Sequence, residues 1–164
     1  MKRFLPILHA VAASAAAAIV AGPATAAPPD GCGVSLAAPE VISAIDSLAP
    51  YPGTDWKWSS SPTTLEGNFN PCATLSTALV TVEGATASSP ITALMFNNGT
   101  YLGTATSKAY GFTRLNAART TDDTVVLDYS TPGVCDACAP AAVTSVRYQW
   151  QNDHVVMLDP PPPS

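Results

Sequence analysis

A series of short β-strand patterns fills residues 71–159 and constrains the fold more than any other feature of this chain. The clearest pattern covers residues 143–151, where three large side chains alternate with polar ones: Val146, Tyr148 and Trp150. This period of two is typical of a strand with one buried and one solvated face. Turn signals separate the runs, among them Asn98-Gly99, a pair that tolerates the positive φ of a tight hairpin. Successive hairpins of this kind predict an antiparallel meander.

One helix is expected ahead of these strands. Residues 39–48 predict it, since Pro39 suits the first helical position and apolar side chains recur on one face. A helix of about ten residues is too short to be stable alone, so it is expected to dock on the sheet. Further strands are expected at residues 71–83, 91–96, 100–106, 110–119, 124–129 and 155–158. The predicted fold class is α+β: an antiparallel β-meander sheet of about five to seven strands, stapled by disulfides, with one N-terminal helix packed on one face.

The start of the chain has the composition of a secretory signal peptide. Lys2 and Arg3 form a positive start, residues 4–20 are apolar and rich in alanine, and Ala24-Thr25-Ala26 is a small-x-small cleavage site. We therefore expect cleavage after Ala26 and export of the rest. An uncleaved membrane anchor is the alternative, which the short and weakly apolar run disfavours.

A chain of 164 residues has room for one domain. We expect a signal peptide over residues 1–26, a single α+β domain over residues 27–159 and a proline-rich tail over residues 160–164. No segment after the signal peptide is long and apolar enough to be expected to span a membrane.

The charge of the chain argues against a nucleic-acid partner. Seven basic and 12 acidic residues give a net charge of −5, and removal of Lys2 and Arg3 leaves 5 against 12, or −7. No basic cluster is present that could neutralise a phosphate backbone. An acidic surface would also be repelled by anionic lipid head groups.

Four cysteines remain after the expected cleavage: Cys32, Cys72, Cys135 and Cys138. An even number in an exported chain predicts two disulfides, for which three pairings are possible. We favour Cys32–Cys72 together with Cys135–Cys138. On chain-entropy grounds the first bond closes about 41 residues and adds roughly 4 kcal/mol, whereas the second closes about 4 residues and adds roughly 2 kcal/mol at most. The first would hold the fold together, and the second would be a local clip.

No catalytic, metal or cofactor site is predicted. Cys135 and Cys138 have the spacing of a redox dithiol, but the surrounding prolines indicate a loop and not the helix N-terminus that lowers a thiol pKa. Two cysteines make no zinc site without two more ligands, and His154 is the single histidine after the signal peptide. His154 lies in an expected hairpin turn, and no Gly-x-Ser-x-Gly elbow accompanies it. Asp122-Asp123 is interpreted as a turn.

Aromatic side chains are the candidates for binding. Tyr51, Trp56 and Trp58 lie in an irregular stretch, and the two tryptophans would point to the same side of an extended segment. Rings near polar groups can stack on sugars or grip an apolar chain. They also commonly fill a small core beneath a long loop. Both interpretations remain open, and these three residues form the possible ligand platform.

Several segments, taken in order, carry a resemblance to a known family: CGV at 32–34, FNPCATLS at 69–76, MFNNGTYLGTA at 95–105, DDTVV at 122–126, VRYQW at 146–150 and VVMLD at 155–159. Together they resemble the LppP/LprE lipoprotein family of actinobacterial cell envelopes. The likeness covers residues 32–161, and its motifs are specific only in combination. It implies an exported envelope domain and brings no catalytic residues. It also supports the pairing of Cys32 with Cys72.

One feature departs from the family name. A lipoprotein needs a cysteine directly behind the apolar run, whereas Cys32 follows Pro28-Pro29-Asp30-Gly31. A lipidated Cys32 could not pair with Cys72, and we expect a secreted or cell-envelope form without lipid. The pair Cys135 and Cys138 is an addition to the family pattern.

The function expected is that of an exported, non-enzymatic binding or structural module. Its partner would be an envelope protein, a glycan or a lipid, and no cofactor is expected. A small extracytoplasmic enzyme, acting by thiol–disulfide exchange or hydrolysis, is the alternative.

Overall fold

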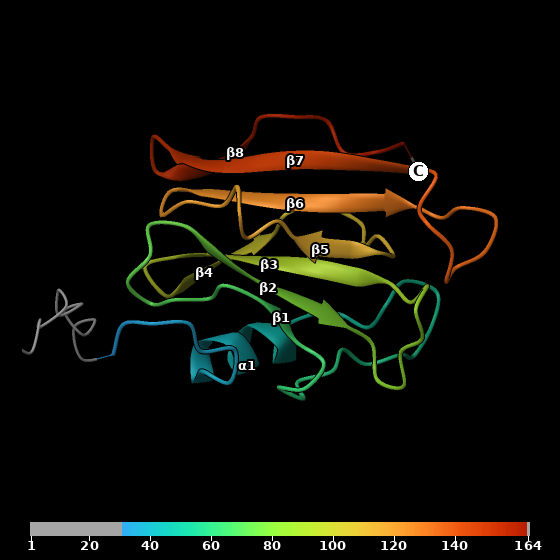
Figure 1. Ribbon diagram of the computed structural model, residues 1–164. Helices are drawn as coiled ribbons and strands as arrows, with labels where there is room; N and C mark the ends of the chain where they lie inside the picture. Colours follow the sequence, from blue (N-terminus) through green and yellow to red (C-terminus); the bar gives the residue numbers. More distant parts are fainter. Residues whose placement is uncertain (1–30, 164) are drawn as a thin grey trace, which may run out of the picture.

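The strand patterns form two antiparallel sheets (Figure 1), so the prediction of a single sheet is wrong. The computed structural model describes residues 31–163, and the expected signal peptide lies outside the described residues. The first sheet contains β1 (Glu66–Gly67), β2 (Ser76–Thr81), β3 (Ile91–Asn97) and β4 (Thr100–Thr104). The second contains β5 (Thr113–Leu115), β6 (Thr124–Thr131), β7 (Ala142–Gln151) and β8 (His154–Met157). Neighbouring strands are antiparallel and follow chain order, so the predicted meander is confirmed within each sheet.

The two sheets pack face to face because β2, β3, β6 and β7 each have an inward row of apolar side chains. From the first sheet, β2 and β3 contribute Leu79 and Met95; from the second, β6 and β7 contribute Leu127 and Val146. The alternation predicted for residues 143–151 is confirmed: Val146 and Tyr148 are buried, and Trp150 packs against the same cluster. The chain passes from one sheet to the other between β4 and β5, and in this connection Tyr110 forms an isolated bridge with Ile91 of β3.

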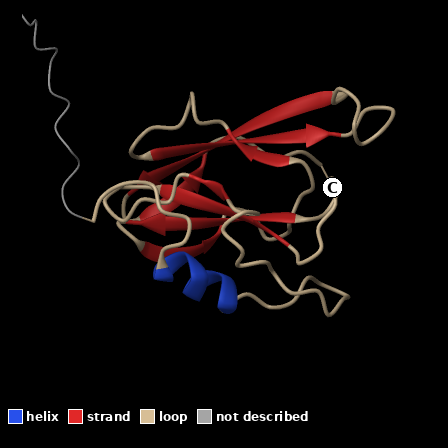
Figure 2. Ribbon diagram, turned by 60° about the horizontal axis from the view of Figure 1, so that its bottom comes forward, coloured by secondary structure: helices blue, strands red, loops and turns tan. Residues whose placement is uncertain are grey.

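The helix α1 (Pro39–Asp46) covers the outer face of the first sheet, as predicted. Val41, Ala44 and Ile45 are buried against apolar side chains of β2 and β3. With the helix on one side and the second sheet on the other, β2 and β3 are buried on both faces (Figure 2). The molecule therefore has three layers, with the first sheet in the middle. Residues 91–96 are apolar on both faces because β3 lies in this central layer.

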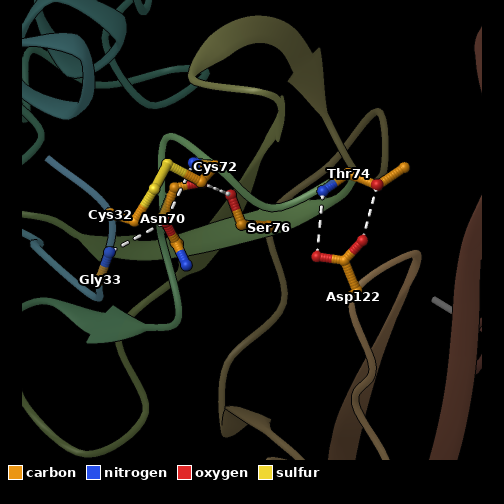
Figure 3. Close-up of a disulfide and its surroundings, with 7 residues drawn as sticks. All are labelled: Cys32, Gly33, Asn70, Cys72, Thr74, Ser76 and Asp122. Atoms are coloured by element: carbon orange, nitrogen blue, oxygen red, sulfur yellow. Dashed lines mark hydrogen bonds between the residues drawn. A yellow bond between two sulfur atoms is a disulfide. The ribbon is translucent and has the colours of Figure 1, made fainter. Parts of the chain in front are cut away.

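The predicted disulfide pairing is confirmed. Cys32–Cys72 joins the segment before α1 to the segment before β2, with the two Cα atoms 5.4 Å apart. The Asn70 side-chain oxygen accepts hydrogen bonds from the backbone N–H groups of Gly33 and Cys72, at 3.1 and 3.0 Å (Figure 3). The second bond, Cys135–Cys138, lies in the exposed loop between β6 and β7.

Asp122 connects this region to the second sheet. Its carboxylate accepts a 2.7 Å hydrogen bond from the Thr74 hydroxyl (Figure 3). Its backbone oxygen accepts one of 2.8 Å from the Leu75 N–H. The turn expected at Asp122-Asp123 is the one that leads into β6. Segments from all three layers therefore meet near the Cys32–Cys72 bond.

Candidate binding cleft at the open edge

The two edges of the paired sheets differ. At one edge β1 and β5 are joined: Glu66 accepts a 2.9 Å hydrogen bond from the Leu115 N–H and lies 3.7 Å from the Arg114 guanidinium. At the other edge β4 and β8 are the last strands of their sheets. Within residues 31–163, no hydrogen bond joins β4 to β8. This second edge leaves the space between the sheets accessible.

A cavity of about 440 Å³ occupies this open edge. Its lining includes two core side chains, Met95 at 2% exposure and Tyr148 at 1%. Trp150, Val155 and Met157 from β7 and β8 also line it. The other lining residues are Leu102, Gly103, Thr104, Ala105, Asp153 and His154. We call this cavity the open-edge cleft; it continues the core between the two sheets outward to the surface.

Strand register explains why the cleft has an apolar wall. Tyr148 pairs with Met157 and Trp150 pairs with Val155 across β7 and β8. Residues directly opposite each other in a sheet present their side chains on the same face. The four side chains therefore form one apolar surface that extends past the edge of the core.

A glycine explains why the opposite wall of the cleft, formed by β4, leaves space for a ligand. Gly103 of β4 pairs with Met95, immediately beside a β-bulge between Met95 and Phe96. A Cβ atom placed on Gly103 would meet no heavy atom within 4 Å, and its φ of +119° is one that glycine adopts without strain. The absence of a side chain on Gly103 and the bulge together leave unfilled space on the β4 side of the cleft.

Apolar side chains gather at the mouth of the cleft. Leu102 and Met157 line it and are each 40% exposed. Single exposed apolar residues are common on protein surfaces, whereas a group beside a concave site is typical of a binding surface. The open-edge cleft is accordingly the candidate functional site.

The polar groups of the cleft do not form a catalytic arrangement. The His154 Nδ1 lies 3.0 Å from the Asn152 backbone oxygen, within its own hairpin turn. The Tyr148 hydroxyl lies 2.8 Å from the Tyr129 hydroxyl, and burial raises the pKa of both tyrosines above the ordinary value. Both phenols are therefore neutral at physiological pH. The arrangement can accommodate an apolar group, with Asp153 and His154 as its ionisable neighbours at the turn.

The predicted ligand platform lies elsewhere. The structure brings its three rings together: the Tyr51 ring stacks on Trp56 at 6.0 Å between centroids and meets Trp58 edge-on at 6.2 Å. None of the three lines the open-edge cleft. The sequence alone identifies Tyr148 and Trp150 as strand residues and not as part of a cleft. Leu102-Gly103 is the local signal for the cleft, and it can be interpreted only once it is known which sheet edges face each other.

Three other features of the described residues bear on function. Cys135 and Cys138 are bonded to each other in a loop, without a helix N-terminus beside them. Between residues 31 and 163, no group of three or more histidine, cysteine or acidic side chains is placed to hold a metal ion. In the same part of the chain, no helix has the length and apolar character needed to cross a membrane.

The profile of the LppP/LprE lipoprotein family matches residues 67–153, which include six of the eight strands in full, β2 to β7. The chain belongs to this family. The match confirms the resemblance expected from the sequence, and it spans both cleft walls up to the turn at Asp153. No solved structure matches the chain.

Mycobacterial relatives carry the name "Putative lipoprotein LprE". The protein from Mycobacterium leprae (strain TN) is 32% identical over 142 residues, which cover 82% of this chain and 66% of the relative. The proteins from Mycobacterium bovis and Mycobacterium tuberculosis (strain H37Rv) are 37% identical over 130 residues, covering 79% of this chain and 59% of each relative. The chain thus spans less than two thirds of the length of these relatives.

Proposed function

We propose that this protein is an exported, non-enzymatic binding module of the cell envelope that holds the apolar chain of a lipid in the open-edge cleft. The observation that carries the proposal is the continuity of the cleft with the core: buried Met95 and Tyr148 line it, and exposed Leu102 and Met157 lie at its mouth. An apolar chain placed there would extend the packing between the two sheets. The names of the mycobacterial relatives support an envelope location.

The dimensions of the cleft favour a single acyl chain over an α-helix of a partner protein. Packed sheets lie about 10 Å apart, and an α-helix with its side chains is about 10–12 Å wide, so a helix would have to spread the sheets. A volume of about 440 Å³ lies within the range of small-molecule sites. The lining contains Asp153 but no lysine or arginine, which favours a lipid whose polar group is uncharged over an anionic one.

The absence of catalysis is part of the proposal. An enzyme acting by thiol–disulfide exchange, one form of the enzymatic alternative, needs a reactive Cys135, and the surrounding loop supplies no group that would stabilise its thiolate. An insulin-reduction assay compares the unaltered protein with Cys135→Ser. No activity above the buffer rate in the unaltered protein agrees with the binding module; catalytic turnover that Cys135→Ser removes would establish the enzyme instead.

We further propose that Cys32 is not the site of a lipid anchor in this chain. Its sulfur is bonded to Cys72, so it has no thiol to form a thioether. The relatives, in contrast, carry the name lipoprotein. Intact mass spectrometry of the exported protein, before and after reduction, distinguishes the two states. A gain of about four hydrogens on reduction fits two disulfides and four unmodified cysteines; a diacylglyceryl addition on Cys32 would refute the proposal.

Tryptophan fluorescence provides a direct test of the cleft. Trp150 lines it, whereas Trp56 and Trp58 do not, so a variant with both Trp56→Phe and Trp58→Phe leaves Trp150 as the reporter. A monoacylglycerol brominated on its acyl chain is the probe, because bromine quenches indole only at close range. We expect saturable quenching of Trp150 below the concentration at which the probe forms micelles.

A matched pair of variants assigns the quenching to the cleft. Leu102→Glu places a charge at its mouth, and Val143→Glu makes the same kind of change on β7 at a residue that is 52% exposed and outside the cleft. Leu102→Glu should weaken binding at least about tenfold, since the bound acyl chain would cover the new charge and remove it from water, and Val143→Glu should leave it unchanged. Equal losses in both variants, or no saturable quenching at all, would refute the proposed site.

A further inference from the structure

A second surface presents aromatic rings to solvent, built from Tyr51, Trp56 and Trp58; we call it the aromatic platform. Trp58 is fixed in place, since its indole N–H donates a 2.8 Å hydrogen bond to the Ala49 oxygen. Its backbone forms a bridge with Val82. The segment around Trp58 therefore extends the first sheet beyond β2, and the platform rests on a rigid layer.

The loop that presents Trp56 is held by its own hydrogen bonds. The Tyr51 N–H donates to the Trp56 oxygen at 3.2 Å, and the Thr54 hydroxyl donates to the Tyr51 oxygen at 2.9 Å. The same hydroxyl accepts from the Trp56 N–H at 3.2 Å. Trp56 stacks on Tyr51 with an angle of 17° between the rings and remains 50% exposed. A large aromatic ring is thus kept half in water by a loop with defined geometry.

Polar side chains gather in a notch beside Trp58. This cavity of about 220 Å³ is lined by Asp46, Lys57, Ser60 and Glu83, together with Ile45, Leu48 and Pro50. Among the described residues, the side chains of Asp46, Lys57 and Glu83 form no ion pair and no hydrogen bond. Two acceptor groups and one donor group are therefore available to a ligand at the edge of the platform.

We propose that the aromatic platform and its polar notch bind a neutral oligosaccharide. The negative face of an aromatic ring attracts weakly positive C–H groups, such as those on the apolar face of a pyranose. One sugar ring would stack on the exposed side of Trp56. Hydroxyl groups of the chain would donate to the carboxylates of Asp46 and Glu83 and accept from the Lys57 ammonium.

The charge balance of the site supports a neutral ligand. Asp46 and Glu83 outnumber Lys57, and the chain after the expected cleavage carries 5 basic against 12 acidic residues, so an acidic polysaccharide would be repelled. The platform shares no residue with the lining of the open-edge cleft. The oligosaccharide proposal is therefore independent of the proposed lipid site, and the two can succeed or fail separately.

Isothermal titration of the exported chain with two uncharged probes, cellohexaose and chitohexaose, tests the proposal. We expect saturable binding of at least one probe, weakened about tenfold or more by Trp56→Ala. Trp150→Phe, a change in the open-edge cleft, should leave the affinity unchanged. Binding by neither probe, or binding that Trp56→Ala leaves intact, would overturn the proposal.

A second variant covers the case in which Trp56→Ala perturbs the loop. Asp46→Asn with Glu83→Gln keeps the shape of both exposed side chains and removes their charges. The melting temperature should stay within about 2 °C of the unaltered protein, while affinity falls several-fold because a charged acceptor forms the stronger hydrogen bond. Undiminished affinity in this folded variant would exclude the notch from the site and overturn the proposal as stated.

Discussion

Removal of the Cys32–Cys72 bond tests how the layers of this domain are held together. The bond spans a sequence separation of 40 and ties the segment before α1 to the first sheet. The perturbation is the double variant Cys32→Ser and Cys72→Ser. Cys135→Ser with Cys138→Ser is the matched control, since it makes the same chemical change at a sequence separation of 3.

The expected magnitudes follow from the entropy of loop closure in the unfolded chain. A loop of about 41 residues restricts that chain by about 13 cal/mol/K, or about 4 kcal/mol at 25 °C, and a loop of about 4 residues by about 6 cal/mol/K, or about 2 kcal/mol. The unfolding entropy of a domain of about 130 residues is about 0.28 kcal/mol/K. The melting temperature should therefore fall by about 14 °C in the first double variant and about 7 °C in the second.

Urea unfolding monitored by circular dichroism, together with calorimetry, measures both losses. Asn70 still joins Gly33 to the segment before β2 in the first double variant, so the native signal should persist at 25 °C. The slope m should rise, because an unfolded chain without the cross-link exposes more surface. Equal losses in the two double variants, or a larger loss in the control, would refute the reasoning from loop length.

Three further changes probe single contacts. Gly67→Ala would bring a Cβ within 2.3 Å of a backbone oxygen of β2 at a φ of +145°, so it should cost more than about 2 kcal/mol in urea unfolding, whereas Gly84→Ala, which meets nothing within 4 Å, should cost less. Tyr148→Phe removes the hydroxyl that hydrogen-bonds to the buried Tyr129 hydroxyl and should cost about 1–3 kcal/mol by the same assay. The hydrogen bonds and charge of Arg147 lower the pKa of Asp159 to about 2 from 3.8. The pair therefore stabilises the fold above pH 3.8 and loses this effect as pH falls toward 2; a carboxyl NMR titration should show the low pKa, and Arg147→Ala should return it toward 3.8.

Elements with a local signal could be predicted from the sequence. Pro39 and the apolar positions that follow it identify α1 and the face it buries. The alternation of Val146, Tyr148 and Trp150 identifies the inward face of β7. The presence of two disulfides follows from the number of cysteines and the expected export, and the family resemblance supports the pairing of Cys32 with Cys72. In each case the residues that determine the structure are close together in sequence or few enough to enumerate.

The division into two sheets could not be predicted in this way. Alternation indicates which face of a strand is buried but not which layer covers it. The connection from β4 to β5 looks like any other hairpin loop, although it carries the chain from one sheet to the other. The open-edge cleft was missed for the same reason, because Gly103 and Met157 become opposite walls only when the sheets are stacked.

The open edge also poses a problem of solubility that the sequence of β4 resolves. An exposed, flat edge strand can pair with another copy and aggregate, and proteins commonly prevent this with charges or bulges. β4, with the sequence Thr-Tyr-Leu-Gly-Thr, carries no charge. Its pairing with β3 is irregular instead: the register shifts between Met95 and Phe96, which leaves Leu102 of β4 unpaired, and Gly103 has a φ of +119°, far from that of a regular strand. The distortion that hinders a second strand from adding to β4 is the one that leaves space between Gly103 and the apolar wall of β7 and β8. A narrow apolar chain could use that space without backbone pairing, which supports the proposed lipid over an added strand as the occupant of this edge.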